Sequence, residues 1–189
     1  MKKSILVLGL GRFGATLATS LCQLGQEVTA VDANAARVDM VKNLVTHALQ
    51  ANVSDERAIS QLGVRNYDCV AVCIGEDIRA SVLAVVMCKE YGAKYVICKA
   101  SDHLHEKLLY KTGADKVFQP EREGAVRLAH PLASQSVLDF IDLSDEYSIS
   151  EVRLPASWAG KTLSTLNVRA VYGISVIALR RRGQIVITL

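Results

Sequence analysis

The chain has 189 residues, of which 50% are hydrophobic and 22% are charged, so it can bury a core and is too apolar to be disordered. Only 5% are aromatic, and a core built mainly from aliphatic side chains is typical of a parallel sheet buried on both faces. The formal net charge of +3 is too balanced to indicate nucleic acid as the main partner.

The sequence contains no recognisable membrane or export segment. Its longest uninterrupted apolar run, residues 82–88, is far shorter than the roughly 20 residues of a membrane-spanning helix. The N-terminal residues lack the hydrophobic region and cleavage site of a signal peptide, so we expect a cytoplasmic protein. No Cys-x-x-Cys pair is present, which favours buried, reduced thiols. The cysteines are Cys22, Cys69, Cys73, Cys88 and Cys98.

Strands and helices alternate over residues 1–118. Glycines end several predicted helices just before the next strand, as Gly25 does after the helix predicted over residues 12–24. Such alternation gives right-handed crossovers and predicts a Rossmann-like, doubly wound parallel sheet with helices on both faces. The predicted strands cover residues 5–8, 27–31, 46–49, 69–72, 95–97 and 116–118.

The helix predicted over residues 77–91 is apolar on more than one side. Leu83 and Met87 extend the apolar surface beyond the side that carries Val82 and Val85. A helix with two apolar sides is buried on both. Another subunit could cover the second side, or the segment 120–140 of the same chain could do so, and the sequence leaves both alternatives open.

The pattern changes after residue 118. Residues 120–140 are predicted to be helical, and we expect this helix to be divided or kinked at Pro131, because proline removes a backbone hydrogen bond inside a helix. The hydrophobic period then becomes two, which predicts short strands. These strands are expected near residues 149–154, 174–179 and 185–189, with a turn over 181–184 joining the last two.

This change of period predicts two domains, residues 1–140 and residues 141–189. The fold class is therefore α/β, with a small α+β domain at the C-terminus. We expect that second domain to be truncated, because natural domains seldom end inside an apolar strand. Its sheet would then be completed by further residues or by another chain.

The clearest motif is a glycine-rich loop between the first predicted strand and helix, Gly9-Leu10-Gly11-Arg12-Phe13-Gly14. It matches G-x-G-x-x-G, and Asp32 follows at the distance expected of a carboxylate that binds ribose. Gly9 permits the tight turn, Gly11 lets backbone N–H groups approach a diphosphate, and Gly14 lets the helix pack close to the sheet. The helix N-terminus adds unpaired donors and partial positive charge.

Two side chains of this region indicate the kind of nucleotide. The carboxylate of Asp32 would repel a 2′-phosphate, which argues against NADP. Arg12 lies beside the diphosphate position, where a dinucleotide needs no cation but the terminal phosphates of a nucleoside di- or triphosphate could use one. A solvent-facing arginine at a helix start remains the alternative.

The rest of the chain does not favour catalysis. No Ser-His-Asp or Cys-His set stands out. His47 is expected to be structural, and His103 and His105, at a predicted helix start, are expected to be exposed to solvent rather than to ligate a metal. A nucleotide-binding module without evident chemistry indicates a sensor rather than an enzyme. An NAD-dependent oxidoreductase or NAD(H) redox sensor is the alternative, since the glycine loop and Asp32 serve NAD equally well.

Several stretches resemble the RCK (KTN) domain, and the resemblance covers essentially the whole chain. The stretch over residues 139–149 is more specifically similar to the regulatory subunits of Ktr-type bacterial potassium-uptake systems. The other matching stretches are residues 8–14, 30–34, 51–56, 113–117 and 120–121.

This resemblance implies a cytosolic ring, an octamer built from dimers, beneath a membrane potassium-translocating subunit. ATP and ADP would bind the glycine loop and favour different ring shapes, which gates the channel. Arg12 would touch the γ-phosphate across a dimer interface, and Asp32, with Asn34 close to it, would hold the ribose. Asn52 would line the adenosine side and Lys99 would face the phosphates.

The resemblance also implies two further ligands. Glu121 matches an acidic residue near the phosphates, where a divalent cation (Mg²⁺ or Ca²⁺) can sit between subunits; a carboxylate stabilised by a helix dipole is the alternative. Residues 145–189 resemble a C-terminal domain that binds cyclic di-AMP in some relatives, with Asn167, Val168 and Arg169 in the matching region. That domain continues further in the family, so we expect any such pocket to be incomplete.

Overall fold

The computed structural model describes residues 2–133, 136–142 and 146–187. Its contacts group the chain into two units, Met1–Ala125 and Val126–Leu189, which are described separately below. The domain boundary expected near residue 140 stays a prediction. No helix in the described part of the chain is long and apolar enough to cross a membrane.

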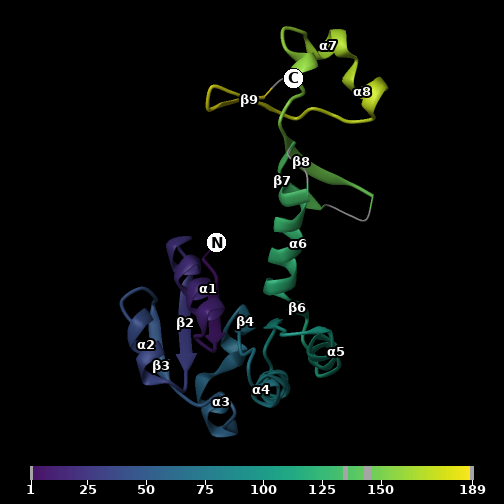
Figure 1. Cartoon of the computed structure of the whole chain (residues 1–189). Coiled ribbons are helices and arrows are strands. Elements are labelled where there is room, and N and C mark those ends of the chain that lie inside the picture. The colour runs from purple at the N-terminus through teal and green to yellow at the C-terminus, as the bar shows by residue number, and fades with distance from the viewer. Residues whose placement is uncertain (1, 134–135, 143–145, 188–189) are drawn as a thin grey trace. The chain divides into compact units, whose positions relative to one another are not determined.

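Six parallel strands form the sheet of the first unit (Figure 1). Their order is β3-β2-β1-β4-β5-β6, so the chain runs outward in one direction from β1 and then in the other from β4. This is the Rossmann-like, doubly wound sheet predicted from the sequence. The strands are β1 (Ser4–Leu8), β2 (Glu27–Asp32), β3 (His47–Gln50), β4 (Cys69–Val72), β5 (Val96–Lys99) and β6 (Lys116–Phe118).

Helices cover both faces of this sheet. On one face lie α1 (Arg12–Gln23) and α2 (Ala35–Val41), and on the other lie α3 (Glu56–Leu62), α4 (Ile78–Glu90) and α5 (His103–Lys111). A short 3₁₀ helix, η1 (Val64–Asn66), precedes β4. Polar caps fix where the helices start, because a side-chain oxygen accepts a hydrogen bond from a first-turn N–H. The residues that do this are Asn34, Asp55, Asp77 and Asp102.

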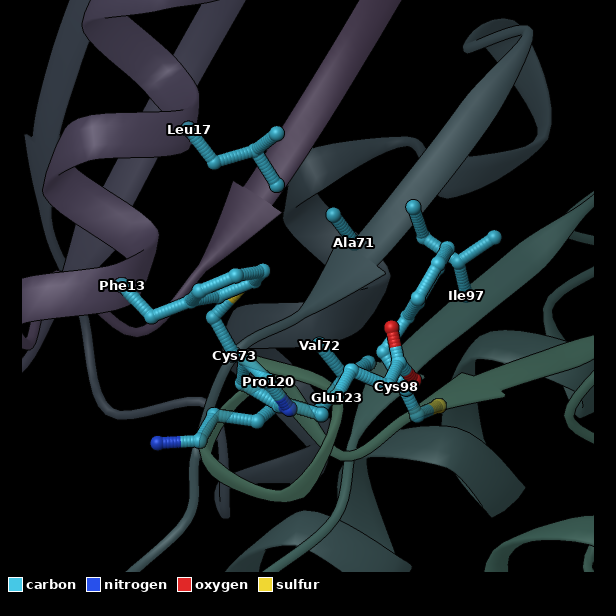
Figure 2. A pocket seen from close by; sticks show the side chains of 11 residues that line it. Phe13, Leu17, Ala71, Val72, Cys73, Ile97, Cys98, Pro120 and Glu123 are labelled. Carbon is cyan, nitrogen blue, oxygen red and sulfur yellow. The ribbon is translucent and has the colours of Figure 1, made fainter. Parts of the chain in front are cut away.

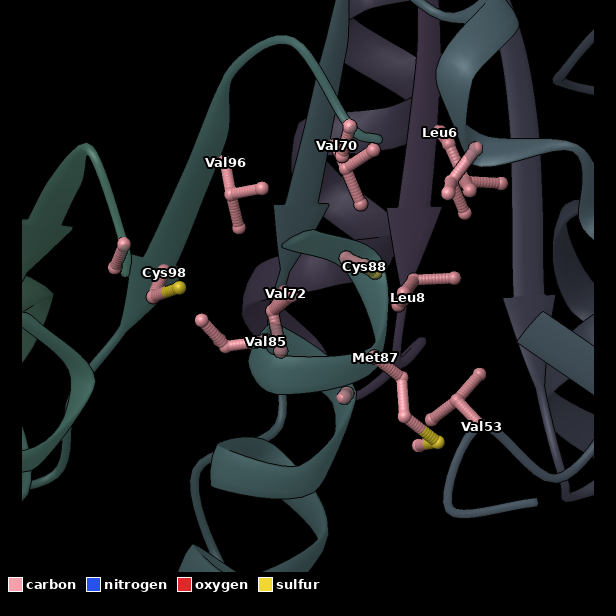
Figure 3. Close-up of a cluster of buried hydrophobic side chains, with 14 of the residues drawn as sticks. Leu6, Leu8, Val53, Val70, Val72, Val85, Met87, Cys88, Val96 and Cys98 are labelled. Atoms are coloured by element: carbon pink, nitrogen blue, oxygen red, sulfur yellow. The ribbon is translucent and has the colours of Figure 1, made fainter. Parts of the chain in front are cut away.

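Alternation along the strands divides the core between the two faces. Leu6, Leu8 and Val72 point toward α4, where they pack with Val85 and Cys88 (Figure 3). The opposite face packs against α1 and α2 and is also aliphatic, as the low aromatic content predicts. Its buried strand residues include Ile5, Val7, Val28, Ala30 and Ala71.

The cysteines are free, and three of them, Cys73, Cys88 and Cys98, are buried as predicted. Burial raises the pKa of the Cys73 thiol to about 12, and that of Cys88 likewise to about 12. Cys22 and Cys69 are only partly buried, although burial still raises the pKa of Cys69 to about 11. The thiols of Cys69, Cys73 and Cys88 are therefore protonated at neutral pH and behave as small apolar side chains.

The prediction of two exposed histidines is wrong for His105. The side chain of His103 is 69% exposed, but His105 is fully buried. The reason is helical spacing, because His105 lies one turn before the buried Leu109 on the inner side of α5. Its Nδ1 lies 3.2 Å from the N–H and from the hydroxyl of Ser101. Its Nε2 has no hydrogen-bond partner among the described residues.

This burial predicts a pH-dependent stability. Loss of hydration lowers the pKa of His105 below its ordinary value of 6.5, with Asp102 opposing the shift. The unfolded chain therefore binds this proton more readily than the folded one, so the unfolding free energy should fall as the pH drops below about 6.5. In His105→Gln this part of the pH dependence should be missing, as measured by urea unfolding at pH 7.5 and 5.5. His103→Gln is the matched control, and an equal loss of the slope in both variants would contradict the prediction.

The secondary structure after residue 120 differs from the long helix that the sequence predicts. Helix α6 (Pro120–Ala133) spans Ala125 and contains Pro131, but it ends at Ala133. The helix expected through residue 140 is wrong, because β7 (Val137–Asp142) is a strand paired antiparallel with β8 (Ser148–Val152). Residues 137–142 form a strand because β8 is available to pair with them, even though the spacing of their apolar residues is compatible with a helix.

The remaining elements of this unit are short. They are η2 (Ala156–Trp158), α7 (Leu163–Leu166), α8 (Val168–Tyr172), β9 (Leu179–Arg181) and β10 (Gln184–Val186). The strand expected over residues 174–179 is wrong, since regular structure begins only at Leu179.

The predicted hairpin is confirmed, because β9 and β10 pair antiparallel and Arg182 and Gly183 form the turn between them. Both turn residues have positive φ, 51° and 80°, as a tight two-residue turn requires. The end of the last predicted strand, residues 188–189, lies outside the described residues.

Candidate functional site

The glycine loop joins β1 to α1 at the carboxyl edge of the sheet. Gly9 has a φ of +96°, and its N–H donates to the carbonyl of Val31 over 2.8 Å. A Cβ on Gly14 would lie 1.9 Å from the carbonyl oxygen of Gly9, so only glycine lets α1 start this close to the loop. A Cβ on Gly11 would meet no heavy atom within 4 Å. Gly9 is therefore needed for the positive φ of the turn and Gly14 for the close approach of α1, whereas Gly11 leaves open space in front of the loop.

Asp32 ties this loop to the end of β2. Its Oδ2 accepts from the N–H of Leu10 at 2.6 Å and its Oδ1 accepts from the N–H of Asn34 at 2.8 Å. The guanidinium of Arg37 approaches Oδ2 to 3.6 Å. The carboxylate is 7% exposed, so its charge is held in place beside the glycine loop by backbone donors and one cation.

The two asparagines predicted to bind the nucleotide, Asn34 and Asn52, lie in the turns that follow β2 and β3. The side chain of Asn34 caps α2 by accepting from the N–H of Ala36 at 2.9 Å. Asn52 follows β3, and its side chain accepts from the N–H of Ser54 at 3.0 Å. Both are exposed. Each therefore shapes a turn and can still offer its amide N–H groups to a ligand.

Lys99, at the end of β5, forms an ion pair with Glu121 in the first turn of α6. Lys99 Nζ lies 2.6 Å from Glu121 Oε1. The hydrogen bond from Lys99 lowers the pKa of Glu121 below its ordinary value, and its own backbone N–H and the positive charge of Arg12 act in the same direction. The charge of Arg12, on the first residue of α1, therefore reaches Glu121. The predicted site residues Lys99 and Glu121 are therefore directly paired, and Arg12 adds the smallest of these contributions.

A largely apolar cavity of about 300 Å³ adjoins this ion pair (Figure 2). Phe13 and Leu17 of α1 lie on one side of it, facing Ala71 and Ile97 on the sheet. Its remaining lining residues are Val72, Cys73, Cys98, Lys99, Phe118, Pro120 and Glu123. Sequence reasoning named Phe13 and Lys99 as site residues but missed this cavity. The cavity arises where α1, the sheet and the start of α6 come together, and spacing along the sequence does not show that meeting.

The chain alone does not build a metal centre from its described residues, because no group of three or more histidine, cysteine, aspartate or glutamate side chains is placed to hold an ion. Glu121 already pairs with an ammonium group. A cation at this position would need oxygen ligands from a bound phosphate or from another chain.

Comparison with known proteins gives the family. Residues 5–120 match the TrkA-N domain model, which covers all six strands except the first residue of β1. The chain belongs to the TrkA-N family. Its TrkA-N domain thus holds the glycine loop, Asp32, Lys99 and the start of α6.

Curated relatives of this TrkA-N protein extend over almost its whole length. It is 40% identical to Ktr system potassium uptake protein C of Bacillus subtilis (strain 168) over 188 residues, 100% of this chain and 85% of the relative. It is 40% identical to protein A of the same organism, covering 97% of this chain and 82% of the relative. It is 36% identical to protein A of Vibrio alginolyticus, covering 97% and 84%. The resemblance to Ktr regulatory subunits is therefore confirmed.

Solved structures agree with the TrkA-N assignment at the level of the fold. The GsuK channel bound to NAD superposes with a TM-score of 0.68 at 17% identity, covering 98% of this chain and 34% of that one. The TrkA-N domain of the inner membrane protein ybaL from Escherichia coli gives 0.62 at 19% identity, covering 70% and 98%.

Proposed function

We propose that this chain is a nucleotide-sensing regulatory subunit that gates a Ktr-type potassium-uptake system. The observation that carries the proposal is the carboxylate of Asp32, fixed beside a glycine loop that has open space in front of Gly11. A ribose and a diphosphate fit those two features. Relatives named as Ktr potassium uptake proteins supply the physiological setting.

The ligand we favour is ATP or ADP. Two cations, Arg12 and Lys99, support this choice, because both act on Glu121 and we assign them to the terminal phosphates. NAD or NADH is the alternative, and one solved neighbour is a GsuK channel bound to NAD while another is GsuK bound to ADP. We propose binding rather than catalysis, because the described residues form no evident nucleophile–base set around the loop.

The partners in this proposal are further copies of the chain and a membrane subunit. An octameric ring of dimers would lie at the cytoplasmic face of the membrane and contact the potassium-translocating subunit. A nucleotide biases such a ring only if it binds its shapes with different affinities. Cyclic di-AMP is a further proposed effector of the C-terminal region.

The proposed divalent cation, Mg²⁺ or Ca²⁺, has one predicted protein ligand, Glu121. Within the described part of a single chain, no further histidine, cysteine, aspartate or glutamate side chains join it to form a cluster that could hold the ion. No step of the gating proposal depends on this cation, and the ligand measurements below are therefore made with a chelator present.

Arg12→Ala should reduce the preference for ATP over ADP while leaving adenosine recognition intact. The guanidinium would contact the phosphate that ADP lacks, and a charge-assisted hydrogen bond is worth about 1.5–3 kcal/mol, or roughly 10- to 100-fold in affinity. Isothermal titration calorimetry with both nucleotides measures this ratio. Arg57→Ala, an exposed arginine near the start of α3, is the control. Equal loss of ATP and ADP affinity would reject the role.

A thermal-shift panel tests the ligand class itself. A ligand that binds the folded chain raises its melting temperature by mass action. We expect ATP and ADP to stabilise the chain more than NAD or NADH. Stabilisation by NADH alone, with turnover of a hydroxy acid or aldehyde, would replace this function by that of an oxidoreductase.

A further inference from the structure

The ion pair between Lys99 and Glu121 has a consequence for ligand choice. We propose that Glu121 is an internal competitor for Lys99, so that it weakens the binding of nucleotides in proportion to the phosphate charge they bring. This inference rests on the proposed function, because it concerns the same nucleotide site. It assigns Glu121 a role in specificity that needs no metal ion.

The first support is that Lys99 is already engaged. Its Nζ lies 2.6 Å from Glu121 Oε1, and the side chain is only 16% exposed. Its terminal atoms pack along Gly75, where a Cβ would lie 3.4 Å from both Cε and Nζ. The ammonium is therefore confined at the edge of the cavity. A phosphate that recruits Lys99 has to replace the carboxylate, since a second anion cannot share that short contact without repulsion.

The second support is the unequal exposure of the two partners. The Glu121 side chain is 69% exposed, so it can turn into water with little change in hydration. Lys99 is largely enclosed, and leaving it without an anion would cost more. When a phosphate approaches, the carboxylate is therefore the group that leaves. The exchange needs only a side-chain rotation in the first turn of α6.

The third support is the position of Glu121 relative to Arg12. The charge of Arg12 acts on this carboxylate as well. Glu121 thus offsets part of the positive potential of both cations that we assign to phosphates. After it leaves Lys99, it remains a negative charge near the phosphate positions. Each additional phosphate meets more of this repulsion, which makes the penalty larger for ATP than for ADP and negligible for adenosine.

Glu121→Gln should therefore bind nucleotides more tightly than the natural chain when EDTA removes all divalent cations. We expect about a threefold gain for ADP, a larger gain for ATP and no change for adenosine, in line with roughly 1 kcal/mol or less for a partly exposed ion pair. Isothermal titration calorimetry measures all three. Glu123→Gln is the matched control, because it removes the same charge from the same turn, but the carboxylate of Glu123 accepts a hydrogen bond from the N–H of Gln119 and does not pair with Lys99.

A double-mutant cycle makes the test specific to the pair. In a Lys99→Met background, Glu121→Gln should raise the affinity for ATP and ADP by less than it does in the natural chain. Affinity in Glu121→Gln equal to or below that of Glu123→Gln would overturn the inference and leave the proposed function standing. If the natural chain binds no adenine nucleotide at all, the proposed function fails, and the inference fails with it. Melting temperatures of all variants show that each remains folded.

Discussion

Gly14→Ala should destabilise the first unit by about 3 kcal/mol or more, the upper range for overpacking a closely packed site. The new methyl group would lie 1.9 Å from the carbonyl oxygen of Gly9 and 3.0 Å from Cβ of Cys73. Neither neighbour can move without displacing the loop or β4. Relief would require α1 to shift away from the sheet. Urea unfolding followed by far-ultraviolet circular dichroism measures the change, because the single tryptophan, Trp158, lies in the second unit.

Gly11→Ala is the matched control for this substitution. Its methyl group would enter open space, and Gly11 has a φ of −63°, which any residue adopts. We expect a loss of at most about 1 kcal/mol, since the position is the N-cap of α1. Nucleotide binding should nevertheless fall sharply, because the methyl group would stand where a diphosphate approaches the backbone. Equal destabilisation by both substitutions would contradict the separate roles of the two glycines.

Asp32→Ala should weaken the binding of every adenine nucleotide by at least about 100-fold. Its carboxylate can accept hydrogen bonds from both ribose hydroxyls, each worth about 1.5–3 kcal/mol for a charged acceptor. The loss should be similar for ATP and ADP, because the ribose is common to both. Isothermal titration calorimetry measures the affinity, at a temperature well below the melting temperature of the variant. Unchanged ADP affinity would refute the ribose assignment.

The same substitution should also lower stability. The N–H groups of Leu10 and Asn34 would lose their acceptor, and a buried donor left unpaired costs about 1–3 kcal/mol. Asp32→Asn separates the two effects, because its amide oxygen can still accept one of these bonds. We expect the asparagine variant to recover part of the stability but little of the affinity.

The sheet was predictable because its determinants are local. The central strands β1 and β4 are short apolar runs, and the glycine loop demands a particular backbone at Gly9 and Gly14. Asp32 was found for the same reason, since its spacing from the loop is fixed by one helix and one strand. These features need no knowledge of distant contacts.

The features that were not predicted depend on partners far along the chain. The strand β7 exists because β8 pairs with it, and its apolar spacing alone is compatible with a helix. His105 was expected in solvent because it flanks Leu104 at a helix start, yet its place one turn before Leu109 turns it inward. The Lys99–Glu121 pair requires β5 and the start of α6 to meet, which no spacing in the sequence shows.

The buried thiols described above can report when the core of the first unit opens, because only an open core lets a reagent modify them. Cys88 and Cys98 lie inside the cluster between the sheet and α4, and a thiol reagent reaches them only when that layer opens. While the layer is closed, burial raises the pKa of both thiols and so also disfavours the reactive thiolate. A thiol reagent should therefore modify the partly buried Cys22 and Cys69 before the core cysteines, which it reaches only in molecules that have begun to unfold.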